Sequence, residues 1–194
     1  MTKVGDILEQ IQVEAIGSDG QCVAKSPEGK VIFIKNVAPG DIVNLKIYKK
    51  EKRFFLADLL EIIQPSPYRV LPKCDYAGVC GGCQWQHVAY QKQLEAKQQQ
   101  VIDQLQRIGQ LELPEVSPIL GADPTYYYRN KLDFAFANKK WLRKEDMHTN
   151  SPTNGLGFHI SGRFDKVLDI DTCHLMPEPV NAIKNALRSF ALQN

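Results

Sequence analysis

The sequence has no apolar run that reaches the ~20 residues a helix needs to cross a bilayer. Residues 1–6 also lack the hydrophobic segment of a secretion signal. These absences predict no membrane partner and a cytoplasmic location, where thiols stay reduced. The net charge of +2 is too small to indicate a nucleic-acid partner, so such evidence has to come from local patches.

Cysteine is scarce too, but three of the five cysteines fall within ten residues. Cys74, Cys80 and Cys83 have the spacing C-x5-C-x2-C, and Cys173 lies far downstream. Clustered cysteines in a reducing compartment are more often metal ligands than disulfides. Four thiolates suit either a tetrahedral zinc ion or an iron–sulfur cluster. Cys22 stands alone in a predicted strand, which is typical of core packing.

The spacing favours a 4Fe-4S cluster over zinc. Zinc sites usually combine two C-x-x-C turns, or one such turn with a histidine pair. A tight trio with one remote cysteine is closer to a cluster-binding loop. Gly81 and Gly82 allow a tight turn between Cys80 and Cys83, and they leave amide groups free to point at sulfur. Zinc stays an alternative, since it accepts the same four ligands.

The first 63 residues predict a small β-barrel. Short apolar or alternating runs over residues 7–16, 21–25, 30–35, 41–48 and 53–63 are separated by Gly and Pro turns. Five such strands in about sixty residues are typical of an OB-like barrel. Barrels of this kind often bind single-stranded nucleic acid.

A basic patch over residues 46–55 is the part of the barrel that indicates RNA. It has five basic residues, one acid and interleaved aromatics, so it offers both phosphate neutralisation and base stacking. The candidate contacts are Lys49, Lys50, Lys52 and Arg53. The alternative is a solvated hairpin tip, because residues 1–63 together hold nine basic and nine acidic residues.

Pro65 and Pro67 mark a boundary, after which helical and strand patterns follow one another. The expected elements are a helix over 88–108, strands over 131–141, 155–160 and 166–170, a polar loop over 143–154, and a final helix over 179–192. The fold class is therefore α+β, mainly β with some α. The predicted domains are a barrel (1–64), a cysteine loop (65–90), a connecting helix (91–113) and a central domain (114–194).

A longer string around the cysteines carries a family resemblance. It reads Pro-Ser-Pro-x-Arg69-Val-x-Pro72-x-Cys74-x5-Cys80-Gly-Gly-Cys83-x-x-Gln86-His87-x-x-Tyr90-x-x-Gln93. This string resembles the iron–sulfur segment of bacterial uracil-5-methyltransferases that act on 23S ribosomal RNA. The run Tyr128-Arg129-Asn130-Lys131 and the segment ending at Cys173 are similar to that family's central domain. The barrel resembles its TRAM domain.

The resemblance implies a 4Fe-4S cluster held by Cys74, Cys80, Cys83 and Cys173. It also implies a further domain that binds S-adenosylmethionine and supplies a nucleophilic cysteine for 5-methyluridine formation. This sequence has no Gly-rich loop in the required strand–helix context, and no cysteine is left over as a nucleophile. We therefore expect the RNA-recognition and iron–sulfur portion of such an enzyme, without its catalytic residues.

Arg129, Lys131 and Tyr128 are the expected RNA contacts outside the barrel, because charge follows three consecutive tyrosines there. The alternative is a strand start packed by aromatics.

The apolar stripe of the 88–108 helix, with Leu94, Val101 and Leu105, would be covered by the barrel or by a second copy in a dimer. Two competing functions are an iron–sulfur electron carrier and a zinc-stabilised RNA-binding module.

Overall fold

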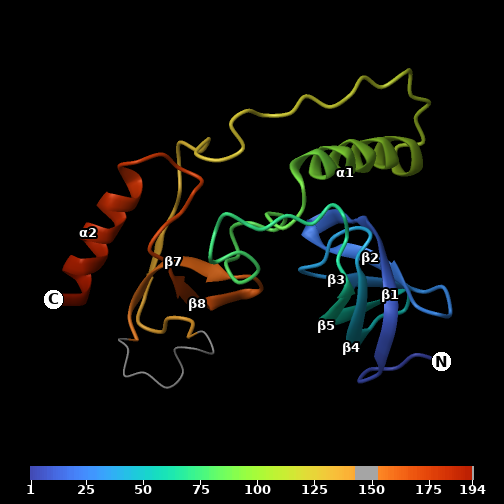
Figure 1. The fold of residues 1–194 in the computed structure, drawn as a ribbon, viewed down its shortest axis with the longest axis horizontal. Coiled ribbons are helices and arrows are strands. Elements are labelled where there is room, and N and C mark those ends of the chain that lie inside the picture. The colour runs from blue at the N-terminus through green and yellow to red at the C-terminus, as the bar shows by residue number, and fades with distance from the viewer. Residues whose placement is uncertain (143–152, 194) are drawn as a thin grey trace. The chain divides into compact units, whose positions relative to one another are not determined.

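The computed structural model describes residues 1–142 and 153–193, and the chain divides into two compact units (Figure 1). The first unit contains residues 1–71 and 85–121, and the second contains residues 72–84 and 122–194. The predicted cysteine loop is thus shared, with its cysteines in the second unit and its flanks in the first. The division into four domains that the sequence indicates, 1–64, 65–90, 91–113 and 114–194, stays a prediction.

The first unit is built on a closed five-stranded barrel with the strand order β1-β2-β3-β5-β4. The strands are β1 (Ile7–Ile16), β2 (Cys22–Lys25), β3 (Val31–Ile34), β4 (Ile42–Lys50) and β5 (Phe54–Gln64). Neighbouring strands are antiparallel except β3 and β5, which pair in parallel. The predicted OB-like barrel is confirmed, and its strands match the predicted runs closely.

The barrel core follows from the period-2 pattern of its strands, which sends alternate side chains inward. Its fully buried members include Ile32, Ile34, Val43, Leu45, Ile47 and Phe55. Each such side chain contributes roughly 1.5–3 kcal/mol on burial. Cys22 belongs to this core, where its thiol donates a hydrogen bond to the Val37 carbonyl at 3.1 Å. Burial raises the pKa of the Cys22 thiol to about 12, so this thiol is protonated at neutral pH.

A buried carboxylate, Asp41, fixes the chain that leaves the barrel. It accepts hydrogen bonds from the backbone nitrogens of Ala38 at 2.6 Å and Ser66 at 2.8 Å, and from the Arg69 guanidinium at 2.8 Å. Burial alone would raise the pKa of Asp41, but the bonds from Arg69, Ala38 and Ser66 outweigh it, and the pKa lies below its ordinary value. Arg69 also donates to the Asn36 carbonyl at 3.0 Å, so the Pro-Ser-Pro-x-Arg string is anchored to the barrel.

The chain returns to the first unit directly beside the segment by which it left. The Val70 nitrogen donates to the His87 carbonyl at 3.1 Å, and the Ala89 nitrogen donates to the Tyr68 carbonyl at 2.8 Å. The His87 Nε2 lies 3.0 Å from the Val37 carbonyl in the barrel. Several residues of the family string therefore close the base of the cysteine loop.

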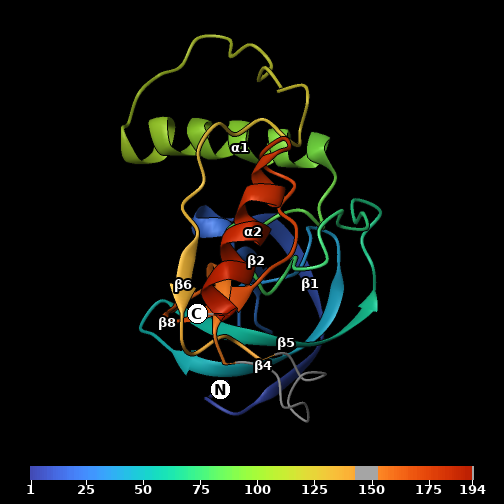
Figure 2. The same ribbon diagram turned by 90° about the vertical axis from the view of Figure 1, so that its left-hand side faces the viewer.

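Helix α1 (Tyr90–Asp103) continues as a π-helical turn over Gln104–Ile108 and lies over one end of the barrel (Figure 2). The Gln100 Nε2 donates to the Gly17 carbonyl at 2.6 Å and so ties the helix down. No residue of α1 is fully buried, and Val101 is 55% exposed. The predicted apolar stripe is thus only partly covered within this unit.

The second unit contains a three-stranded antiparallel sheet with the order β6-β7-β8. Its strands are β6 (Ala135–Ala137), β7 (Gly155–Ile160) and β8 (Arg163–Asp169), and helix α2 spans Val180–Gln193. A side chain at Gly157 would put its Cβ 2.0 Å from the Leu168 carbonyl oxygen, so only glycine fits between these strands. Arg188 on α2 donates from Nε to Asp169 at 2.8 Å, which joins the helix to the end of β8.

Three expectations for the second unit need correction or lie outside the described residues. The predicted strand over 131–141 is much shorter, because β6 pairs with β7 only over residues 135–137. The strand expected over 166–170 begins earlier, at Arg163, because the preceding turn is short. Most of the predicted polar loop, residues 143–152, lies outside the described residues. Across the described ranges, no helix has the length and apolar character needed to cross a membrane.

We expect Asp41→Asn to destabilise the chain by about 3 kcal/mol at neutral pH, because it leaves the Arg69 charge without its partner. The folded-state pKa of Asp41 is lowered, so its contribution is complete above the ordinary value of ~3.9 and fades as the pH falls below it. Urea unfolding at pH 7 and pH 3 measures this, and the gap between variant and parent should narrow at pH 3. The control is Asp58→Asn, an exposed acid on β5. An equal gap at both pH values would show that the ion pair is not responsible.

Candidate metal centre and nucleic-acid interface

The cysteine loop, residues 72–84, packs on the core of the second unit. Leu168, Ile170, Cys173 and Leu175 form that core, and Tyr76, Val79, Cys80 and Cys83 pack against it. The Asp171 nitrogen donates to the Tyr76 hydroxyl at 2.9 Å, and Cys80 makes an isolated bridge to Ile160. The loop is thereby fixed against the end of β7 and the chain beyond β8.

The two glycines of Cys-Gly-Gly-Cys have different roles. The Gly81 nitrogen donates to the His159 carbonyl at 3.1 Å, and a Cβ at Gly81 would lie only 2.6 Å from that oxygen. Gly81 therefore permits a close backbone approach. The Gly82 nitrogen points at the Cys80 sulfur at 3.4 Å, while a Cβ at Gly82 would meet that sulfur at an ordinary 3.5 Å. An amide is thus directed at a sulfur, as the sequence predicted.

Cys173 is held by the first turn of α2. The Cys173 nitrogen donates to the Asn181 Oδ1 at 2.8 Å, and the Asn181 Nδ2 donates back to the Cys173 carbonyl at 3.1 Å. Asn181 is itself buried. The ammonium group of Lys184, one turn further, donates to the Ile170 carbonyl. Two polar side chains of α2 therefore fix the backbone on which Cys173 stands.

The four thiols of the second unit lie within electrostatic range of one another. Burial raises the pKa of Cys80 to about 11, and negative charge on Cys83, Cys74 or Cys173 would raise it further, against the Gly82 amide. Burial likewise raises the pKa of Cys74 and of Cys173, with Cys83 contributing to both. The loop and the remote cysteine therefore meet in one region.

Backbone amides and one guanidinium oppose this accumulation of negative charge. The amides of Tyr76 and Ala77 lower the pKa of Cys74, and the amide of Leu175 lowers that of Cys173. The Arg129 charge also acts on Cys173 to lower its pKa. Groups of this kind stabilise an anionic cluster through its sulfur atoms.

A single metal ion would need several ligand side chains that converge on one point. Within residues 1–142 and 153–193, no group of three or more His, Cys, Asp or Glu side chains is arranged to hold one. A zinc ion binds thiolates at ~2.3 Å, which brings its four sulfur atoms within about 4 Å of one another. In a four-iron cluster each cysteine binds a different iron, so the sulfur atoms stand further apart.

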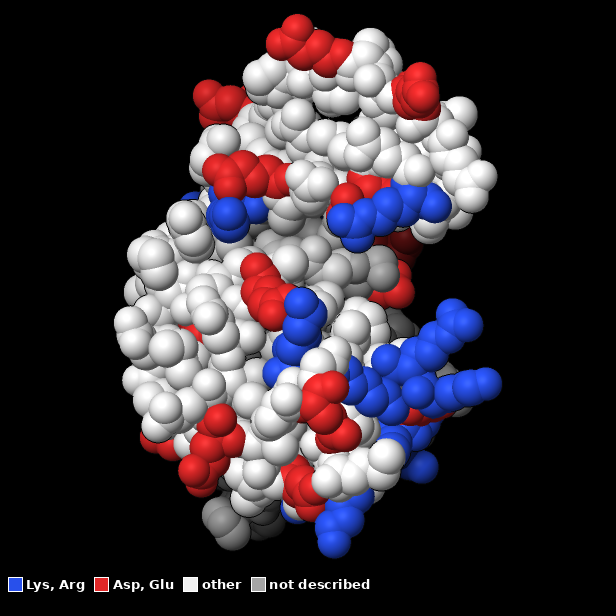
Figure 3. Space-filling view, turned by 90° about the vertical axis from the view of Figure 1, so that its right-hand side faces the viewer, with Lys and Arg blue, Asp and Glu red and all other residues white. Residues whose placement is uncertain are grey.

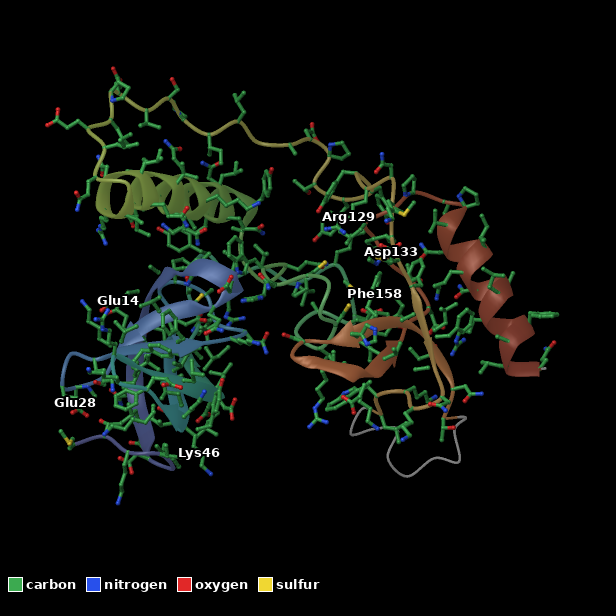
Figure 4. The ribbon with its side chains drawn as sticks, turned by 180° about the vertical axis from the view of Figure 1, so that it is seen from behind. Glu14, Glu28, Lys46, Arg129, Asp133 and Phe158 are labelled. Carbon is green, nitrogen blue, oxygen red and sulfur yellow. The ribbon has the colours of Figure 1, made fainter. Side chains whose placement is uncertain are left out.

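The RNA contacts expected outside the barrel are all exposed, but they differ in their neighbours. Figure 4 labels one of them, Arg129, together with Asp133. Lys131 forms a surface ion pair with Asp133 at 3.5 Å. Tyr128 is 57% exposed. The Arg129 nitrogen donates to the Leu175 carbonyl at 2.8 Å, which places its backbone beside the segment that follows Cys173. Arg129 and Tyr128 thus lie close to the cysteine site in the second unit.

The barrel patch lies at the junction of β4 and β5, and Figure 3 shows basic side chains gathered along one edge of the face that it draws. Lys49 pairs with Glu51 at 2.8 Å, and the Lys50 ammonium donates to the Thr2 carbonyl at 3.0 Å. Lys52 and Arg53 are exposed in the turn itself. Two of the four predicted cations therefore have partners in the barrel, and the turn presents the other two to solvent.

The sequence pattern did not predict the positions of Asn181 and Lys184. The hydrophobic pattern of α2 predicts that Val180, Ile183, Leu187 and Phe190 form its apolar face. In the structure Ile183, Leu187 and Phe190 are more than half exposed, while Asn181 and Lys184 are buried. Polar bonds to the backbone, which no hydrophobic pattern records, decide which side of this helix faces the unit.

Known RNA methyltransferases are similar to this chain over most of its length. A family described as the TRAM domain matches residues 2–60, which cover most of the barrel. An RNA methyltransferase of Bacteroides thetaiotaomicron, described as uncharacterized, is 44% identical over 92% of this chain and 40% of its own length. The 23S rRNA (uracil(1939)-C(5))-methyltransferase RlmD of Nitrosospira multiformis is 33% identical over 93% of this chain and 38% of its own length. The chain is similar to these RNA methyltransferases over nearly its whole length, and its barrel is a TRAM domain.

A solved structure confirms the fold. The tRNA (uracil-54, C5)-methyltransferase of Pyrococcus abyssi, in complex with S-adenosyl-L-homocysteine, matches 95% of this chain and 37% of its own with a TM-score of 0.55. At 23% identity this likeness concerns the fold alone. The chain spans about 40% of the length of the curated relatives it matches.

Gly81→Ala should destabilise the chain by about 1–3 kcal/mol, because its Cβ would collide with the His159 carbonyl of β7. Gly82→Ala is the matched control, since its Cβ meets the Cys80 sulfur at a normal distance. Thermal unfolding of the two metal-free variants measures the difference. Equal melting temperatures would contradict the close approach described for Gly81.

Proposed function

We propose that this chain is the RNA-recognition and iron–sulfur portion of an S-adenosylmethionine-dependent RNA uracil-5-methyltransferase that acts on 23S-type ribosomal RNA. The identity with RlmD over nearly the whole chain supports the reaction and the substrate class. In this proposal, residues outside this chain bind S-adenosylmethionine and transfer the methyl group, and the chain itself spans about 40% of the length of these relatives.

The observation that carries the proposal is the meeting of Cys74, Cys80, Cys83 and Cys173 in the second unit. They come from two distant stretches of sequence, and each acts electrostatically on others of the set. Directed amides and the Arg129 charge suit an anionic group. The sequence spacing, a tight trio with one remote cysteine, favours a 4Fe-4S cluster over a zinc ion.

The cluster's contribution is structural. When bound, it cross-links the cysteine loop to the segment after β8 and so stabilises a small unit with a limited core. Asn181 and the Gly82 amide keep Cys173 and Cys80 in position for it. Uracil methylation involves no electron transfer, so an electron-carrier function has no support from the reaction of the relatives.

Anaerobic purification of the chain tests the metal. We expect a brown protein with about four irons and a broad visible absorbance band. Cys173→Ser should lose most of the iron, whereas Cys22→Ala should keep it, because Cys22 lies in the barrel core. A colourless protein with one zinc per chain would contradict the cluster and favour the zinc-stabilised RNA-binding module.

RNA binding by the barrel has its own test. Replacing Lys52 and Arg53 together by alanine should weaken binding of an RNA oligonucleotide. It should also reduce the slope of log affinity against log salt by about 1.4, since each phosphate contact on a single strand contributes about 0.7. The control replaces Lys97 and Arg107, two exposed cations of the α1 segment, and makes the same change in charge. If both double variants alter the slope equally, the turn is not a specific contact.

A dimer through the exposed stripe of α1 stays a prediction. Val101 is exposed on α1, and Leu105 and Ile108 are exposed on the π-helical turn that continues it. Sedimentation of the purified chain at several concentrations decides between one copy and two.

A further inference from the structure

Three consecutive tyrosines in the second unit, residues 126–128, present aromatic surface to solvent. Tyr127 is 41% exposed and Tyr128 is 57% exposed, although large aromatic rings are usually mostly buried. A Lys ammonium from the cysteine loop covers part of this surface. The Lys73 Nζ lies 4.6 Å from the ring centre of Tyr127 and 5.1 Å from that of Tyr126. Exposed rings and a cation therefore occur together at one place.

The backbone of Tyr127 is strained. Its φ of +57° falls in the left-handed region, which a bulky side chain rarely adopts. The surroundings hold it there. The Tyr127 nitrogen donates to the His174 carbonyl at 2.9 Å, and the Tyr127 hydroxyl lies 3.0 Å from the His174 Nδ1. Strain kept in this way is characteristic of binding sites, where it fixes a side chain before the ligand arrives.

The two ring systems meet at right angles. The rings of Tyr127 and His174 are 5.9 Å apart with an interplanar angle of 82°. An edge contact of this kind orients the tyrosine ring without stacking a second ring on it. The ring of Tyr127 is therefore both oriented and accessible, as a stacking surface for a flat ligand must be.

We propose that Lys73, Tyr126, Tyr127 and His174 form a stacking site for one unpaired RNA base. Tyr127 supplies the stacking surface, and Lys73 supplies a charge for the adjoining phosphate. Unpaired bases of RNA are bound in this way, by aromatic rings combined with nearby cations. Arg129, two residues beyond Tyr127, adds a second exposed cation. The inference rests on the RNA binding proposed above, and it adds Lys73, Tyr127 and His174 to the contacts that the sequence predicted at Tyr128, Arg129 and Lys131.

The site also adjoins the metal ligands. Lys73 directly precedes Cys74, and His174 directly follows Cys173. A group bound by both Cys74 and Cys173 would therefore also hold Lys73 and His174 in place, and these two residues contact Tyr127. This connects the structural role of the cluster to RNA binding.

A fluorescent base analogue tests the stacking directly. The probe is a single-stranded oligouridine RNA with one 2-aminopurine, whose fluorescence is quenched on stacking. Tyr127→Ala of the metal-loaded chain should lower the affinity about tenfold or more and abolish most of the quenching. Tyr127→Phe keeps the ring and should retain the quenching. Lys73→Ala should lower the affinity and reduce the salt slope by about 0.7.

The chain contains a matched control in its first unit. Tyr68 is 43% exposed and has the Lys92 Nζ 4.7 Å from its ring centre, so Tyr68→Ala removes a similar cation–π pair elsewhere. This variant should bind the probe like the parent. Parent-like affinity and quenching in both Tyr127→Ala and Lys73→Ala would overturn the stacking site alone. If the unaltered chain binds no RNA, the proposed function fails together with this site. If Tyr127→Ala does not fold, Lys73→Ala decides.

Discussion

The buried carboxylate of Asp41 determines where the chain leaves the barrel, and the cysteine loop depends on that point. Two backbone amides and the Arg69 guanidinium satisfy Asp41, so residues 66–69 have one position relative to β4. The segment that returns to the first unit then bonds to the segment that leaves it, because the Val70 nitrogen donates to the His87 carbonyl. Arg69 and His87 belong to the string that resembles a metal-binding segment, yet their contacts are with the barrel. They define the two ends of the loop, and the cysteines lie between those ends.

Within the second unit, backbone contacts fix the segments that carry the four cysteines of the proposed metal site. Gly81 allows the loop to touch β7, and Asn181 holds the Cys173 peptide from both sides. A cluster that binds there would enter a site whose two halves are already oriented. Lys73 and His174, the sequence neighbours of Cys74 and Cys173, both contact the strained Tyr127. In our proposals, one arrangement thus serves both cluster binding and RNA stacking.

Much of the fold was predictable because the barrel strands obey a simple period. The runs over residues 30–35 and 41–48 were predicted to be strands, and they form β3 and β4, in which Ile32, Leu45 and Ile47 are buried. The strand over 131–141 was overestimated, because the pattern of Leu132, Phe134 and Phe136 does not show that β7 offers only three partners. The predicted buried face of helix α2 was wrong for another reason. Its hydrophobic face is exposed, since Asn181 and Lys184 bond to distant backbone groups.

The sequence by itself determined the barrel, the family resemblance and the four candidate thiol ligands, because strand period, cysteine spacing and glycine placement are local properties of the chain. The tertiary structure decided which groups surround those thiols. It brought Asn181 to Cys173, the His159 carbonyl to Gly81, and Lys73 to Tyr127. These contacts join residues up to 78 positions apart, here Gly81 and His159. Such pairs follow from packing and hydrogen bonding between elements, which no local pattern of residues records.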